Sequence, residues 1–143
     1  MVQKITDYFK LKLPDQFVGW TREALEDYVI FHLNQNTLKV AVDEHDNVAG
    51  VVVGWRTKDK ELKPWTWQKS DNNGMFWYWD QMAGDSPIAV MACCAAMFFQ
   101  FPESAVLPAF GVRNGKLRDI QIGIKLYKKG QELYGSNSTS TGT

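Results

Sequence analysis

The spacing of hydrophobic and polar residues predicts a strand and then a helix at the start of the chain. Over Lys4–Leu13 the apolar side chains fall mostly at alternate positions, which is typical of a short edge strand. Pro14 ends this segment. Over residues 15–34 the apolar side chains return at helical spacing, and either Asp15 or Thr21 can serve as the N-cap.

The next part of the chain predicts three strands. Leu38–Val42 alternates between apolar and polar positions, whereas Val48–Trp55 is almost continuously apolar, as in a strand covered on both faces. The turn residues Glu44–Asn47 join them into an antiparallel hairpin. After a polar loop over Arg56–Gly74, the aromatic run Met75–Asp80 predicts the third strand.

A tight connection over Gln81–Asp85 is expected to lead into a second long helix. Ser86 followed by Pro87 is a common helix opening, because serine caps the first turn and proline tolerates its first position. Residues 88–101 are apolar on every side, so we expect this helix to be buried.

The last predicted elements are two strands over Val106–Val112 and Leu117–Tyr127, joined by a turn at Asn114-Gly115. The order predicts an α/β (α+β) fold with a mixed, mostly antiparallel sheet and helices on both faces. The apolar helix would cross over between two parallel strands. We expect one domain over residues 1–134 and a disordered Ser/Thr/Gly tail over 135–143.

Charge and cysteine content exclude some classes of function. The 16 basic and 16 acidic side chains cancel, which argues against a nucleic-acid binder or a protein of anionic membrane surfaces. No apolar run reaches the length of a membrane span. Cys93 and Cys94 are adjacent and lie among apolar residues, which favours buried free thiols over a reactive pair and indicates a reducing, cytoplasmic compartment.

The segment after the aromatic strand is the first candidate site. A strand, a glycine-containing turn and a helix N-terminus can hold an anion such as a pyrophosphate on their N–H groups. Here the candidate ligand-binding residues are Gln81, Met82, Ala83, Gly84, Asp85 and Ser86. The alternative is that Asp85 and Ser86 only cap the helix. That alternative is strengthened because the segment carries no Lys or Arg.

Three side chains are candidates for proton transfer. Asp80 ends the aromatic strand, with Tyr78 two residues earlier on the same face, so the carboxylate can act as a general base or simply be a polar strand end. His32 flanks the apolar side of the first helix, where a structural role is more common than a catalytic one. The two histidines are isolated, and we expect no metal site.

Two further features indicate protein partners. Trp65 and Trp67 in the polar loop either pack against the body of the protein or form an exposed lid. A basic stretch near the end of the chain is either a solvated face or a receptor for an acidic protein or a phosphate. Its members are Arg113, Lys116, Arg118, Lys125, Lys128 and Lys129.

The element order, and the spacing of Gln81, Gly84 and Ser86 after a strand, resemble the GNAT acyltransferase superfamily. A closer likeness is to its branch of toxin-activating lysine acyltransferases, which modify RTX toxins. The segments that carry this likeness are AVDEHDNVAGVVVGW (41–55), MFWYWDQMAGD (75–85), FFQFP (98–102) and RNGK (113–116). At the level of pattern it covers residues 24–122.

The resemblance implies transfer of an acyl group from acyl-CoA or acyl carrier protein to an amine, such as a protein lysine. An acidic carrier protein needs no pyrophosphate site and suits the basic stretch. In this branch a histidine precedes the first long helix, but residues 4–20 contain none, and Tyr78 stands where its aspartate is expected. Asp80 and His32 are therefore the candidate replacements.

The alternative is a catalytically inactive module of the same fold, for instance one encoded by a phage. Such a module would bind a protein through Trp65, Trp67 and the aromatic strand, or would form a homodimer.

Overall fold

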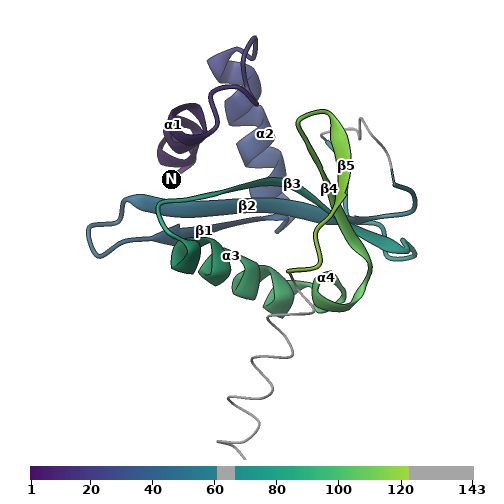
Figure 1. The fold of residues 1–143 in the computed structure, drawn as a ribbon. Coiled ribbons are helices and arrows are strands. Elements are labelled where there is room, and N and C mark those ends of the chain that lie inside the picture. Colours follow the sequence, from purple (N-terminus) through teal and green to yellow (C-terminus); the bar gives the residue numbers. More distant parts are fainter. Residues whose placement is uncertain (61–66, 123–143) are drawn as a thin grey trace, which may run out of the picture.

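The computed structural model describes residues 1–60 and 67–122 as four helices and a five-stranded sheet (Figure 1). The elements are α1 (Val2–Lys12), α2 (Arg22–Asn34), β1 (Leu38–Val42), β2 (Val48–Thr57), β3 (Phe76–Gly84), α3 (Pro87–Gln100), α4 (Glu103–Val106), β4 (Ala109–Arg113) and β5 (Lys116–Asp119). The strand order is β1-β2-β3-β4-β5. Only β3 and β4 are parallel neighbours; the other pairs are antiparallel.

Helices cover both faces of the sheet (Figure 1). On one face, α1 and α2 pack over a core that includes Tyr28 and Tyr78, which we call the α1–α2 core. On the other face, α3 packs over a second core that includes Trp77 and Trp79, which we call the α3 core. The prediction of a mostly antiparallel sheet between helices is confirmed, and the α3–α4 segment joins the two parallel strands.

The prediction of an edge strand over Lys4–Leu13 is wrong, because residues 2–12 form α1. Ile5 and Phe9 are fully buried, one helical turn apart, whereas Leu11 is 74% exposed. The apparent alternation of the sequence came from Leu11, whose side chain takes no part in the core. The four-residue spacing of the buried pair is the signal that the structure follows.

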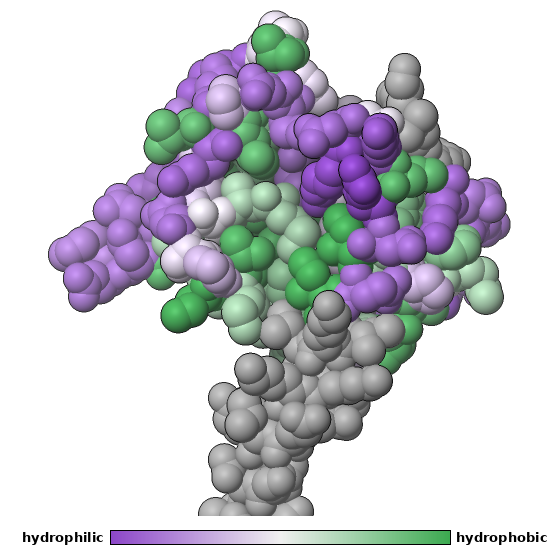
Figure 2. All heavy atoms as spheres, viewed as in Figure 1, coloured by the Kyte–Doolittle hydropathy of each residue, from purple (hydrophilic) through white to green (hydrophobic). Residues whose placement is uncertain are grey.

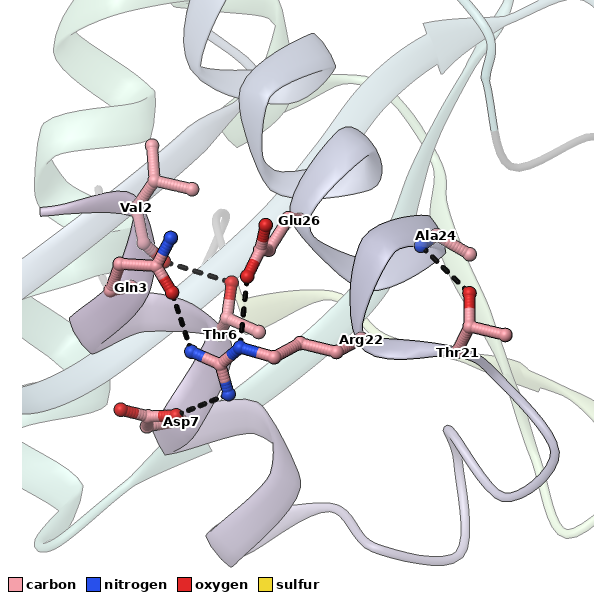
Figure 3. A network of polar contacts seen from close by, with 8 residues as sticks. All are labelled: Val2, Gln3, Thr6, Asp7, Thr21, Arg22, Ala24 and Glu26. Atoms are coloured by element: carbon pink, nitrogen blue, oxygen red, sulfur yellow. Dashed lines mark hydrogen bonds and ion pairs between the residues drawn. The ribbon is translucent and has the colours of Figure 1, made fainter.

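A polar network fixes α1 against the start of α2 (Figure 3). The Arg22 guanidinium donates hydrogen bonds to Asp7 at 2.7 Å, to Gln3 at 2.6 Å and to Glu26 at 2.8 Å. Asp7 and Gln3 belong to α1, so one side chain of α2 ties the two helices together. This network lies at the surface and fixes α1 relative to α2, the helix that carries Tyr28.

Thr21 caps α2, so the second of the two predicted N-caps is correct and Asp15 is not used. The Thr21 hydroxyl accepts a hydrogen bond from the N–H of Ala24 at 3.0 Å. We expect Thr21→Ala to lower the free energy of unfolding by about 1 kcal/mol, because it leaves this N–H without its partner. Thr21→Ser keeps the hydroxyl and is the control; equal losses for both variants in urea denaturation would contradict the capping role.

Strand β3 is longer than the sequence predicted, and the expected tight connection over Gln81–Asp85 is wrong. Residues 81–84 continue the strand and pair with β2, from Gln81 opposite Val53 to Gly84 opposite Gly50. The register shifts between Val53 and Gly54, where Trp79 and Gln81 are paired and Asp80 is the extra residue. Asp80 therefore occupies a β-bulge in the middle of a strand.

The final hairpin is confirmed at its turn and is shorter than predicted. Asn114 and Gly115 both have positive φ, 54° and 73°, as the Asn-Gly turn requires. The first strand begins at Ala109, after α4, and the return strand ends at Asp119. The rest of the strand predicted to reach Tyr127, and the tail over 135–143, lie outside the described residues.

The prediction that the apolar helix is buried on all sides is wrong. Cys93, Cys94 and Met97 of α3 are fully buried, but Ile88 is 78% exposed and Phe99 91% exposed. The two cysteines are free and buried, as predicted. Burial raises the pKa of the Cys93 thiol to about 11 and that of Cys94 to about 12, so both are protonated and unreactive at neutral pH.

Trp67 packs against the body of the protein. Its ring lies 6.2 Å from that of Tyr28 and 5.7 Å from that of Phe31, in edge-to-face geometry. Trp65 lies outside the described residues. The aromatic side chains Trp77, Tyr78 and Trp79 of β3 are buried as well. The described tryptophans therefore do not form the exposed binding surface that the inactive-module hypothesis requires.

Candidate functional site

Strands β3 and β4 pair at their beginnings and then separate. Their parallel pairing covers only Trp77 opposite Ala109 and Tyr78 opposite Phe110. Beyond this point β3 continues through Gly84, and among the strands of residues 1–60 and 67–122 it pairs there with β2. Over residues 80–84, between the bulge and the start of α3, no other strand of these described residues pairs with the opposite edge of β3.

Main-chain groups of β3 face this unpaired edge. The N–H of Asp85 bonds to the carbonyl of Ala49 at 2.8 Å, which places the residue pair 49/85 in a hydrogen-bonded position of the β2–β3 ladder. Because such positions alternate along an antiparallel pair, Ala83 also points its backbone groups toward β2. Met82 and Gly84 then point theirs the other way, toward the unpaired edge.

The Asp80 carboxylate is buried at the bulge and receives two phenolic hydrogen bonds. Tyr78 donates to one oxygen at 2.9 Å, and Tyr28 of α2 donates to the other. Asp80 is 8% exposed. Asp80 and Tyr78 lie on the same face, as predicted. Tyr28 was missed as a site residue because it appeared in the sequence only as part of the apolar side of a helix.

The pKa values of Asp80, Tyr28 and Tyr78 are all raised in the folded protein. Burial raises the pKa of Asp80, while the hydrogen bonds from Tyr28 and Tyr78 and the positive charge of Arg113 oppose that rise. Burial and the neighbouring Asp80 charge raise the pKa of both tyrosines. The two phenols therefore stay protonated and act as hydrogen-bond donors at neutral pH. The raised pKa of Asp80 makes its carboxylate a stronger base.

His32 lies in the same buried cluster, although it does not contact Asp80 by any hydrogen bond given by the structure. Its ring is 4.6 Å from that of Tyr28 and stacks on Trp55 at 5.1 Å. Its Nδ1 lies 2.7 Å from the Thr37 hydroxyl, and the ring is fully buried. The geometry favours the structural role, because the His32 ring packs against Tyr28 and so helps to position the phenol that bonds to Asp80.

The end of the site toward α3 offers few donors for an anion. The Ser86 hydroxyl accepts a hydrogen bond from the N–H of Ala89 at 3.2 Å, and the Ser86 carbonyl accepts one from the N–H of Val90. Pro87 has no N–H. In the first turn this leaves only the N–H of Ile88 for a ligand. Ser86 therefore acts as the helix cap, as one of the two hypotheses proposed, and the dipole of the helix is already used in part.

Asp85 turns away from the helix end. Its carboxylate accepts from Tyr8 of α1 at 2.8 Å and forms an ion pair with Lys12 at 3.1 Å. The hydrogen bonds from Tyr8 and Lys12 lower the pKa of Asp85. The expectation that Asp85 caps α3 with its side chain is therefore wrong; the residue instead locks α1 to the end of β3.

Of the described members of the basic stretch, Arg113 is the one whose charge acts on Asp80. Its guanidinium donates to the carbonyls of Val112 at 2.9 Å and Trp79 at 3.4 Å, across the point where the strands separate. Lys116 and Arg118 are exposed on β5, and the three remaining lysines lie outside the described residues.

Residues 1–60 and 67–122 contain no group of His, Cys, Asp and Glu side chains arranged to hold a metal ion. None of the helices in this part of the chain combines the length and apolarity needed to span a membrane. Comparison with protein families, with curated proteins and with solved structures gave no match to this chain.

Proposed function

We propose that the protein is an N-acyltransferase of GNAT-like architecture that takes its acyl group from an acyl carrier protein. The observation that carries this proposal is the edge of β3 that no described strand pairs with once β4 has separated from it. An acyl thioester on a pantetheine arm contains amide groups, which can bond to the strand edge at Met82 and Gly84 as another strand would.

Asp80 is the proposed general base. A neutral amine attacks the thioester carbonyl, the C–N bond forms, the C–S bond breaks, and the sulfur leaves as a thiolate of the carrier that afterwards takes the proton from Asp80. The amine must lose one proton in this exchange, and the Asp80 carboxylate at the bulge accepts it. The hydrogen bonds from Tyr28 and Tyr78 hold the carboxylate in place. A pKa raised by burial makes it a better proton acceptor than an exposed carboxylate.

The N-terminus of α3 has few free hydrogen-bond donors, which favours a carrier protein over acyl-CoA as the acyl donor. A pyrophosphate needs several free N–H groups or basic side chains, whereas Ser86 and Pro87 leave one N–H in the first turn of α3. An acyl carrier protein presents one phosphate and an acidic surface. Exposed Lys116 and Arg118 suit such a partner.

The test compares acyl carrier protein and CoA loaded with the same acyl chain, with a lysine peptide as acceptor, and measures the released thiol. We expect the carrier protein to be the better donor. Asp80→Asn should lower the transfer rate by at least about 100-fold, while Asp27→Asn, an exposed carboxylate on α2, should leave it unchanged. Absence of thiol release from both donors, or equal rates for Asp80→Asn and the wild type, would overturn the proposal.

The pH dependence gives a second readout of the same base. Because the pKa of Asp80 is raised and only the carboxylate can accept a proton, transfer should increase as the pH rises through that pKa.

A further inference from the structure

The outer face of α3 is an apolar surface that the described part of the chain leaves uncovered. Its members share one side of the helix and are all exposed: Ile88, Met91, Ala92, Ala95, Ala96 and Phe99. Phe99 is 91% exposed, Ile88 78% and Met91 44%. We call this set the α3 face. In Figure 2 green and pale green spheres cover the region of α3, whereas the region of α1 and α2 is mainly purple.

The α3 face carries no charge along its length. The 14 residues of α3 include no Lys, Arg, Asp or Glu, and at 1.5 Å per residue the face extends over about 21 Å. A continuous exposed apolar surface of this kind marks an interaction site. The absence of basic side chains disfavours an anionic membrane, which binds helices with Lys and Arg on their polar side. It equally disfavours a charged protein surface.

We propose that the α3 face binds the α3 face of a second copy of this chain, in an antiparallel and symmetric pair. In a two-fold interface, if residue i of one copy contacts residue j of the other copy, then residue j of the first copy contacts residue i of the second. The α3 face satisfies this condition about a centre between Cys93 and Cys94. Ile88 then lies opposite Phe99, Met91 opposite Ala96, and Ala92 opposite Ala95.

The sizes of these side chains fit the pairing. The alanines lie at the centre, where small side chains let two helices approach closely, and Met91 meets the small Ala96 rather than another large residue. At each end of the proposed contact, Ile88 of one copy meets Phe99 of the other. The large aromatic side chain of Phe99 makes it the main anchor of the interface.

The unreactive thiols agree with this arrangement. Cys93 and Cys94 lie under the centre of the proposed pair but point into the α3 core, where they are fully buried. The dimer is therefore held by packing alone, and reducing agents should not dissociate it.

The test is sedimentation velocity of the full chain between about 1 and 100 μM, a range that covers dimers of modest interface size. We expect a concentration-dependent dimer that a reducing agent leaves unchanged. Phe99→Glu should raise the dimer dissociation constant by at least about 30-fold, and Ala95→Glu should act in the same direction. Leu11→Glu is the matched control, because Leu11 is 74% exposed on α1, on the opposite side of the sheet.

Three results would overturn the proposal. The first is a monomer at every concentration, including one that instead sediments with phosphatidylcholine vesicles. The second is a dimer that Phe99→Glu and Ala95→Glu leave intact. The third is a large loss of monomer stability in Phe99→Glu, which would mean that the chain covers this face with its own residues. The measurement is independent of acyl transfer, so its outcome does not depend on the proposed function.

Discussion

Gly54→Val should lower the free energy of unfolding by about 3 kcal/mol or more, at the upper end of what an overpacked core costs. Gly54 lies in β2, an interior strand of the sheet. A Cβ atom there would lie 2.8 Å from the indole nitrogen of Trp77, 2.9 Å from the ring of Trp79 and 2.9 Å from the carbonyl of Tyr78. Both rings are fully buried and the carbonyl belongs to the adjacent strand, so none of the three can move away cheaply.

Gly50→Ala in the same strand is the matched comparison. Its Cβ would lie 3.1 Å from the carbonyl of Ala89 and 3.2 Å from the Ala89 side chain, at the start of α3, where a small shift of the helix relieves the contact. We expect Gly50→Ala to lower the free energy of unfolding by much less than Gly54→Val, measured by urea denaturation followed by tryptophan fluorescence. Equal stabilities of Gly54→Val and wild type would show that the two tryptophans are packed less tightly than described.

The second large effect concerns Asp80 and separates its structural from its chemical role. Asp80→Ala removes the acceptor of two buried phenolic hydrogen bonds, from Tyr28 and Tyr78. Each orphaned hydroxyl costs about 1–3 kcal/mol, so the variant should lose about 2–6 kcal/mol of stability. Asp80→Asn keeps the size and one acceptor oxygen, and we expect it to remain folded.

The sign of the pH dependence follows from the raised pKa of Asp80. The folded chain binds a proton at this carboxyl where the unfolded chain, with a pKa of about 4, has already lost it. The resulting stabilisation is complete below the unfolded pKa and is lost as the pH rises through the folded pKa. The stability of Asp80→Asn relative to wild type should therefore increase with pH across this window.

Urea denaturation at several pH values measures this difference directly. A stability gap between Asp80→Asn and wild type that stays constant with pH would show that burial does not raise the pKa of Asp80. A stability of Asp80→Asn that falls relative to wild type as the pH rises would show that the hydrogen bonds and Arg113 lower the pKa of Asp80 overall.

The sequence predicted the layers of the fold but not the detail that forms the site. The apolar spacing in β1, β2 and the first part of β3 located those strands, and Asn114-Gly115 located the last turn, because each depends on local preference. The β-bulge at Asp80 depends on the register between β2 and β3, two strands distant in the chain. The strand signal was therefore ended at Asp80, and residues 81–84 were assigned to a loop.

Side-chain partners were predictable only in part. Asp80 and Tyr78 share one face of β3 by the two-residue period of a strand, which the sequence contains. Tyr28 reaches Asp80 only because α2 crosses the sheet above the bulge, and no local pattern indicates that crossing. Likewise, the uniform apolar character of α3 does not reveal which of its sides faces the sheet, since both sides consist of the same residue types.

The two outer strands of the sheet are poor templates for another strand. β5 spans only Lys116–Asp119, all of its residues are exposed, and three of the four are charged. β1 carries Lys39 and has an irregular register at Ala41 and Val42. Short, charged and irregular edges discourage edge-to-edge growth. Association of folded molecules through the edges of the sheet into open-ended fibrils is thereby disfavoured.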